Sequence, residues 1–118
     1  MKLRLESDTL RFRLSPAELD RLLASGSLTA STPLPGGAFR YAVELTDGDD
    51  WAFTGDAHHI VLRLPKLDVL GHKAELPSKT GLLRTLRVNG GVLDVCFEID
   101  AKRPRTHRTG KPAAPDQD

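Results

Sequence analysis

The first fourteen residues contain two short runs in which apolar and polar side chains alternate. Alternation with a period of two places the apolar side chains on one face of a strand and the polar ones on the other. The two runs are joined by Ser7 and Asp8, which favour a tight turn. We therefore predict a hairpin with an apolar inner face made of Leu3, Leu5, Leu10, Phe12 and Leu14.

The outer face of this hairpin is cationic. With the turn at residues 7–8, Arg4 lies opposite Arg11, and Lys2 lies opposite Arg13. Like charges directly opposite each other destabilise a hairpin by up to about 1 kcal/mol per pair. We therefore expect an anionic group to lie over this face.

Two sources of that negative charge remain open. The last strand carries Asp94, Glu98 and Asp100 in one phase, and these carboxylates could form a ladder of ion pairs with the cations. Alternatively, the guanidinium groups could bind the phosphate or carboxylate of a ligand, because arginine offers a planar fork for bidentate contacts.

A helix is predicted directly after the hairpin, over residues 16–25. Ser15 is a typical N-cap, Pro16 suits the first helical position, and Glu18 completes a capping box. Gly26 can adopt the left-handed conformation that ends a helix.

Most of the remaining chain again alternates with a period of two. We expect strands at 28–32, 38–46, 51–54 and 58–64, a loop at 33–37, one or two helical turns over 66–72, and a loop at 73–80. A second hairpin is expected from strands at 82–88 and 92–99.

Two registers are open for that second hairpin. A turn at Asn89 and Gly90 would place Leu86 opposite Leu93. A turn at Gly90 and Gly91 would instead place Arg87 opposite Asp94, and we favour it because it adds an ion pair.

These elements indicate an α+β fold with one capped helix after the second strand. We expect a mainly antiparallel, strongly twisted sheet, and a partial barrel formed by rolling of this sheet is an open alternative. Residues 1–101 form one expected domain. Residues 102–118 combine five Lys or Arg with two Asp and lack apolar periodicity, so we expect a basic, proline-containing mobile tail.

Several short segments resemble a family of small uncharacterised bacterial proteins. The similar segments are residues 2–5, residues 10–14, Glu18, Gly26, residues 39–41 and residues 64–65, with Glu98 and Asp100 matching the end of the final strand. The resemblance spans most of residues 1–101 and implies a shared fold, with no activity assigned.

Other kinds of site are disfavoured by the sequence. Cys96 is the single cysteine, so it cannot form an internal disulfide, and neighbouring carboxylates oppose thiolate formation. His58 and His59 are adjacent on an expected strand and point to opposite faces, so they cannot share a metal. We expect no metal and no cofactor.

The same reasoning sets expectations for partners and location. The aromatic residues lie in the apolar phase of their strands, which argues against base stacking and specific nucleic-acid binding. No apolar run is long enough to span a bilayer, and no secretion signal precedes the hairpin, so we expect a soluble, cytoplasmic protein. The oligomeric state is left open.

Three functions follow from these features. We favour a small non-catalytic binding module that uses Lys2, Arg4, Arg11 and Arg13 to bind an anionic ligand or an acidic partner surface. One alternative is a hydrolase of phosphorylated substrates, in which Arg4, Arg11 and Arg13 hold the phosphate. Asp94 or Glu98 would then be the base or a magnesium ligand. The other is a structural protein that pairs through its sheet edges.

Overall fold

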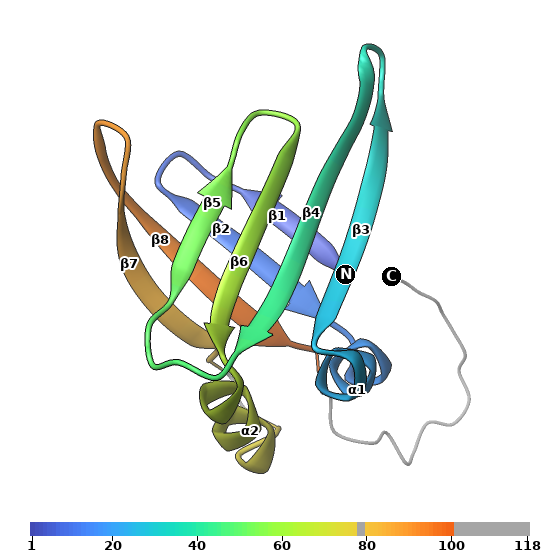
Figure 1. The fold of residues 1–118 in the computed structure, drawn as a ribbon, viewed down its shortest axis with the longest axis vertical. Helices are drawn as coiled ribbons and strands as arrows, with labels where there is room; N and C mark the ends of the chain where they lie inside the picture. The colour runs from blue at the N-terminus through green and yellow to red at the C-terminus, as the bar shows by residue number, and fades with distance from the viewer. Residues whose placement is uncertain (78–79, 101–118) are drawn as a thin grey trace, which may run out of the picture.

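The computed structural model describes residues 1–77 and 80–100 and consists of two four-stranded sheets with two helices across one end (Figure 1). The elements in chain order are β1 (Lys2–Leu5), β2 (Thr9–Leu14), α1 (Pro16–Ser25), β3 (Ser27–Leu34), β4 (Gly37–Thr46), β5 (Ala52–Gly55), β6 (His59–Pro65), α2 (Lys66–Ala74), β7 (Leu82–Val88) and β8 (Gly91–Ile99). The predicted tail at 102–118 lies outside the described residues.

Each sheet combines hairpins from the two halves of the chain. One sheet has the strand order β1-β2-β8-β7, and the other has the order β3-β4-β6-β5. Strands within a hairpin are antiparallel, whereas the central pairs β2–β8 and β4–β6 are parallel. The α+β class with mostly antiparallel strands is thus confirmed, but the strands form two sheets and no closed barrel.

The two halves of the chain have the same architecture. Each half consists of a hairpin, a helix and a second hairpin, and the first hairpin of one half pairs with the second hairpin of the other. Corresponding registers agree: Leu3 lies opposite Phe12 in β1–β2, as Phe53 lies opposite Leu62 in β5–β6. The structure therefore has an approximate twofold repeat, which was not predicted from the sequence.

Hydrogen bonds outside the strand ladders repeat as well. The backbone N–H of Glu6 donates to the carbonyl of Thr9 at 2.8 Å, and that of Asp56 donates to His59 at 2.9 Å, closing equivalent turns. Next to these turns, Asp94 N–H donates to the carbonyl of Asp8 at 3.0 Å, and Arg40 N–H donates to that of His58 at 2.8 Å. The repeat therefore extends to individual backbone contacts.

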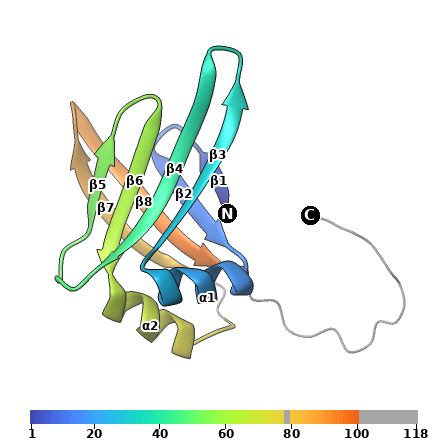
Figure 2. The ribbon, with the colours of Figure 1, turned by 45° about the vertical axis from the view of Figure 1, so that its right-hand side comes forward.

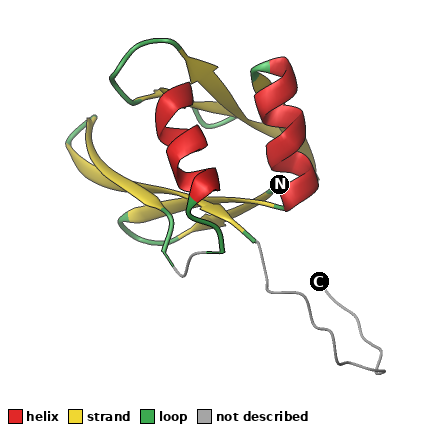
Figure 3. Cartoon of the chain, turned by 90° about the horizontal axis from the view of Figure 1, so that it is seen from below, coloured by secondary structure: helices red, strands yellow, loops and turns green. Residues whose placement is uncertain are grey.

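The core lies between the sheets and is closed at one end by both helices, as seen from below in Figure 3. Its fully buried side chains alternate along the central strands or lie on the inner sides of the helices: Phe12, Leu14, Leu19, Leu22, Val43, Leu62, Leu64, Val69, Val95 and Phe97. Burial of alternate residues is the expected result of the period-two pattern.

Helix α1 begins as the sequence predicts. The Oγ of Ser15 accepts from the N–H of Glu18 at 3.2 Å, and the Glu18 carboxylate accepts from the N–H of Ser15 at 2.8 Å. Gly26 ends the helix with a φ of 87°. Helix α2 is longer than the one or two turns expected for residues 66–72, and it lies beside α1 under the sheets (Figure 2).

The predicted loop at 33–37 is wrong, because β3 continues to Leu34 and turns through Pro35 and Gly36 into β4. Strand β3 is a sheet edge. Because Leu34 and Gly37 close the turn, the nitrogen of Pro33 points away from β4. A proline at that position removes no ladder hydrogen bond.

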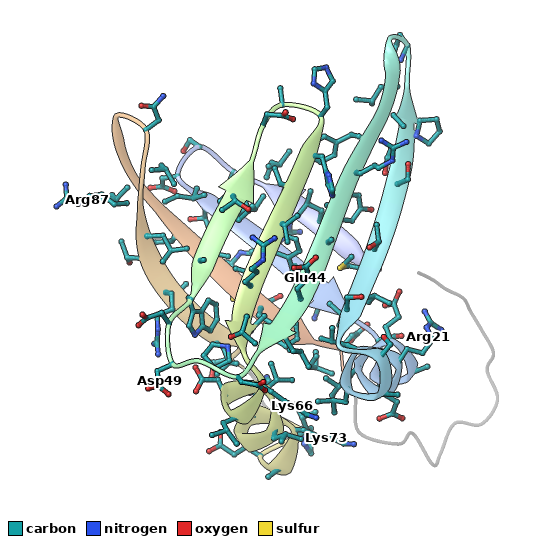
Figure 4. The ribbon with its side chains drawn as sticks, in the orientation of Figure 1. Arg21, Glu44, Asp49, Lys66, Lys73 and Arg87 are labelled. Atoms are coloured by element: carbon teal, nitrogen blue, oxygen red, sulfur yellow. The ribbon has the colours of Figure 1, made fainter. Side chains whose placement is uncertain are left out.

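The favoured register of the second hairpin is also wrong. The turn lies at Asn89 and Gly90, Leu86 pairs with Leu93, and Arg87 lies opposite Val92. Gly90 has a φ of 82°, a conformation that a two-residue turn ending in glycine supplies at low cost. Arg87 points outward from β7 (Figure 4). Turn geometry therefore outweighed one surface ion pair.

Among the described helices, none combines the length and apolar character that crossing a membrane requires.

Candidate functional site: a cationic sheet face

Four cations lie on the outer side of the β1–β2 hairpin, in the register expected from the sequence. Arg4 lies opposite Arg11, and Lys2 lies opposite Arg13. We call Lys2, Arg4, Arg11 and Arg13 the cationic face. All four line a surface cavity of about 460 Å³, together with Leu3, Leu5 and Glu98.

Arg11 is held by two carboxylates. Its Nη1 donates to Oε2 of Glu98 at 2.9 Å, and its Nε donates to Oε1 of Glu6 at 3.3 Å. These hydrogen bonds, first to Glu6 and then to Glu98, raise the pKa of Arg11 above its ordinary value. Arg11 is therefore a fixed cation whose charge is largely balanced within the protein.

The remaining acidic residues contribute unequally. Asp100 lies 3.9 Å from Arg13, at the limit of an ion pair. Asp94 accepts from the hydroxyl of Thr85 on β7 at 2.6 Å, and among the described residues it forms no ion pair with the cations. Of the three candidate counterparts, Glu98 and Asp100 therefore lie beside the cationic face, and Asp94 contacts a different strand.

Lys2 and Arg4 have no such partner. Within residues 1–77 and 80–100, no carboxylate oxygen lies within 4.0 Å of the charged nitrogens of either side chain. Both residues are exposed. The internal ion pairs thus leave two neighbouring positive charges on β1 available for contact.

The repeat provides an internal comparison for these charges. In the second half of the chain, the positions equivalent to Lys2, Arg4, Arg11 and Arg13 are Ala52, Thr54, Val61 and Arg63. Only Arg63 is charged, and it donates to Glu44 and to Thr54, each at 2.9 Å (Glu44 is labelled in Figure 4). An equivalent hairpin therefore forms without three of the four cations, so the fold does not require them.

Cys96 is buried beneath the cationic face and is unsuited to nucleophilic chemistry. Its thiol donates to Oε2 of Glu98 at 3.4 Å, and the side chain is 4% exposed. Burial first, and then the Glu98 carboxylate, raise the pKa of Cys96 to about 11. At neutral pH the thiol is protonated, whereas the nucleophile of a cysteine enzyme is a thiolate.

Strand β1 also borders an apolar groove on its inner side. The groove has a volume of about 310 Å³ and lies between β1 and the β3–β4 hairpin. We call it the β1 groove; it is lined by Leu3, Leu5, Thr32, Leu34, Phe39 and Tyr41. Leu5 and Leu34 are 69% and 53% exposed, so the groove presents apolar surface to solvent.

Neither Glu6 nor the β1 groove was predicted from the sequence. Glu6 shares the phase of Lys2 and Arg4, so the alternation could have placed it beside Arg11. The groove had no local signal, because it exists only where β1 and the β3–β4 hairpin from opposite sheets lie side by side.

No three His, Cys, Asp or Glu side chains in the described part of the chain converge in the manner of metal ligands. The acidic turn at residues 47–50 is exposed.

The fold and the site together define a class: a small α+β protein made of two β-β-α-β-β halves, with a cationic outer face on one sheet. The chain belongs to a family of unknown function (DUF7009), whose family model matches residues 1–101. No curated protein and no solved structure matches the chain.

Proposed function

We propose that this protein is a non-catalytic binding module and that the cationic face binds an anionic group of a ligand or an acidic partner. The observation that carries the proposal is the state of Lys2 and Arg4. They line the cavity of about 460 Å³ without a carboxylate partner among the described residues, whereas Arg11 beside them is paired twice.

The ion pairs of Arg11 support this role instead of removing it. Glu6 and Glu98 fix the guanidinium in place, which lowers the entropy lost when a further anion approaches. Lys2 and Arg4 then supply uncompensated charge on the same face. An anion bound there contacts cations that are already positioned by a hairpin.

The hydrolase alternative is weaker because its proposed base is already engaged. Glu98 accepts hydrogen bonds from both Arg11 and Cys96, and Asp94 accepts from Thr85. A general base needs a carboxylate oxygen that can reach the proton of the attacking group. The engaged Glu98 instead fits a role in holding Arg11.

A thermal-shift panel at fixed ionic strength tests the proposal, with phosphate, pyrophosphate, citrate, a nucleotide and short DNA compared against chloride. Ligand binding to the folded state raises the melting temperature. We expect at least one multivalent anion to do so in the wild type. The shift should be lost in the double variant Lys2→Ala/Arg4→Ala.

Arg87→Ala is the matched control, because it removes an exposed cation from β7 in the same sheet. It should retain the shift. If chloride stabilises the protein as much as every other anion, or if the double variant responds like the wild type, the proposal is wrong.

A further inference from the structure

Strand β1 forms one edge of its sheet. Among the strands in residues 1–77 and 80–100, its only neighbour is β2, so part of its backbone is directed outward without a strand partner in this part of the chain. Hydrogen-bonded pairs alternate along an antiparallel ladder, and Glu6 N–H bonds to Thr9. Lys2 and Arg4 are two and four residues before Glu6, so they also form hydrogen-bonded pairs with β2. The N–H and C=O groups of the intervening Leu3 and Leu5 therefore point away from β2. These groups can bind a further strand.

The two sides of β1 have opposite chemistry. Lys2 and Arg4 project to the outer face, whereas Leu3 and Leu5 line the β1 groove on the inner side. A strand added to β1 would place alternate side chains beside these two pairs, because neighbouring strands align side chains on each face about 4.5–5.5 Å apart. One set would meet the cations, and the other set would enter the groove.

We propose that β1 accepts an extended segment of a partner protein as a fifth strand, and that this segment alternates acidic and apolar residues. The inference rests on the proposed function and names the partner class for the same face. Backbone hydrogen bonds would supply affinity, and the alternate side chains would supply specificity. The acidic residues would pair with Lys2 and Arg4, and the apolar residues would fill the β1 groove.

Charge argues against a second copy of this chain as the occupant. Pairing β1 with β1 of another molecule would bring Lys2 and Arg4 beside their own copies, and like charges on adjacent strands are destabilising. Cations on an edge strand are a known protection against self-association. The same charges favour a segment of opposite sign.

The other three edges in the described structure lack this combination. Strand β3 carries Pro33, which removes an outward N–H group. Strand β5, the equivalent of β1, has Ala52 and Thr54 on its outer face. On strand β7, Arg84 lies between Leu82 and Leu86 on the same side of the strand, so that side is not continuously apolar. The guanidinium of Arg84 lies 5.3 Å from the ring centre of Trp51.

The inference is tested with an eight-residue peptide of alternating glutamate and valine, blocked at both ends, and the full chain. Hydrogen exchange followed by NMR should show protection of the Leu3 and Leu5 amides on peptide addition. The amides of Phe53 and Gly55, which occupy the equivalent edge of β5, should not change. A peptide with lysine in place of glutamate should not bind.

N-methylation of the peptide tests strand pairing directly. Methylating every valine should abolish binding to β1 if the added strand is antiparallel, and methylating every glutamate should do so if it is parallel. We expect at least a tenfold difference in Kd between the two methylated peptides. Equal affinities would contradict strand addition.

The remaining outcomes separate this inference from the proposed function. Affinity should fall at least tenfold in Lys2→Ala/Arg4→Ala and stay unchanged in Arg87→Ala. If inorganic anions stabilise the protein through Lys2 and Arg4 but the peptide leaves Leu3 and Leu5 unprotected, strand addition alone is wrong. If the peptide protects these amides equally well in the double variant, the cations do not select the segment and the acidic partner class is wrong. The proposed function is wrong if the anion shift itself persists in the double variant.

Discussion

The carboxylate of Glu98 lies between a guanidinium and a thiol, 2.9 Å from Nη1 of Arg11 and 3.4 Å from Sγ of Cys96. This position links the first hairpin to β8. It also sets the reactivity of Cys96, because a nearby negative charge disfavours the thiolate.

We expect Glu98→Gln to lower the pKa of the Cys96 thiol from about 11 and so to increase its alkylation rate at pH 8. The variant removes the negative charge and leaves Arg11, which favours the thiolate. Iodoacetamide labelling followed by mass spectrometry measures the rate. Glu44→Gln makes the same change at the equivalent position of the other sheet and should not alter the labelling rate of Cys96. An unchanged labelling rate in Glu98→Gln would contradict the role of the Glu98 carboxylate in raising the pKa of Cys96.

Ser15→Ala should destabilise the protein by about 1 kcal/mol, within the range of about 0.5–2 kcal/mol measured for lost N-caps. The hydroxyl of Ser15 accepts from the N–H of Glu18, which would have no other helical partner. Urea denaturation measures the free energy of unfolding. Ser31→Ala alters an exposed serine on β3 and should stay within about 0.5 kcal/mol of the wild type. Equal losses in both variants would refute the role of the cap.

Leu14→Ala and Leu64→Ala should each cost about 2–5 kcal/mol in unfolding free energy. The two leucines occupy equivalent positions at the ends of β2 and β6, and both are 0% exposed. Leu67→Ala, at a side chain that is 76% exposed on α2, is the control and should have little effect. Urea denaturation should give both core variants a much lower free energy of unfolding than the control. A small loss of unfolding free energy in either core variant would show that the two halves are not packed equivalently.

Gly55→Ala should be destabilising by more than about 1 kcal/mol. Gly55 has a φ of 133°, and a Cβ at this position would lie 2.1 Å from the carbonyl oxygen of His59. Gly36→Ala is the matched control, because a Cβ added at Gly36 would have nothing within 4 Å of it. Thermal unfolding compares the two variants, and similar melting temperatures would show that the turn at β5 can rearrange.

The Asp56 carboxylate should make stability depend on pH in the acidic range. It accepts from the N–H of His58 at 2.8 Å and of His59 at 3.1 Å, and these two bonds, in that order, lower the pKa of Asp56. A lowered pKa stabilises the folded state above the ordinary value of about 3.9, and this stabilisation is lost as the pH falls through the folded-state pKa.

Asp56→Asn therefore should lose less stability than the wild type when the pH is lowered from about 5 to about 2. Urea denaturation across this range measures the difference. Glu6→Gln alters the equivalent residue of the first turn, whose carboxylate bonds to Arg11 instead, and it controls for a general loss of acidic charge. If the unfolding free energies of Asp56→Asn and the wild type fall in parallel as the pH is lowered, Asp56 does not contribute to the acid dependence of stability.

Local features of the fold could be predicted from the sequence because they depend on neighbouring residues. The first hairpin, its register, the capped start of α1 and most strand positions follow from alternation, turn residues and capping preferences, all of which act between residues close together in the chain. The cationic face followed from the same alternation, since the register of one tight turn fixes which cations lie opposite each other.

The errors arose where a local rule competed with a position in the tertiary structure. Pro33 is accommodated because β3 is an edge. Arg87 lost its expected partner because the turn at Asn89 and Gly90 set the register.

The sequence by itself determined which segments are strands, which segment is a capped helix and which side chains face inward. Only the tertiary structure decided that β2 pairs with β8 and β4 with β6, so that two similar halves exchange hairpins and leave the β1 groove beside the cationic face. The physical reason is that alternation specifies the buried face of a strand but not its neighbour. Neighbours are selected by the burial of all apolar faces together, which no single segment encodes.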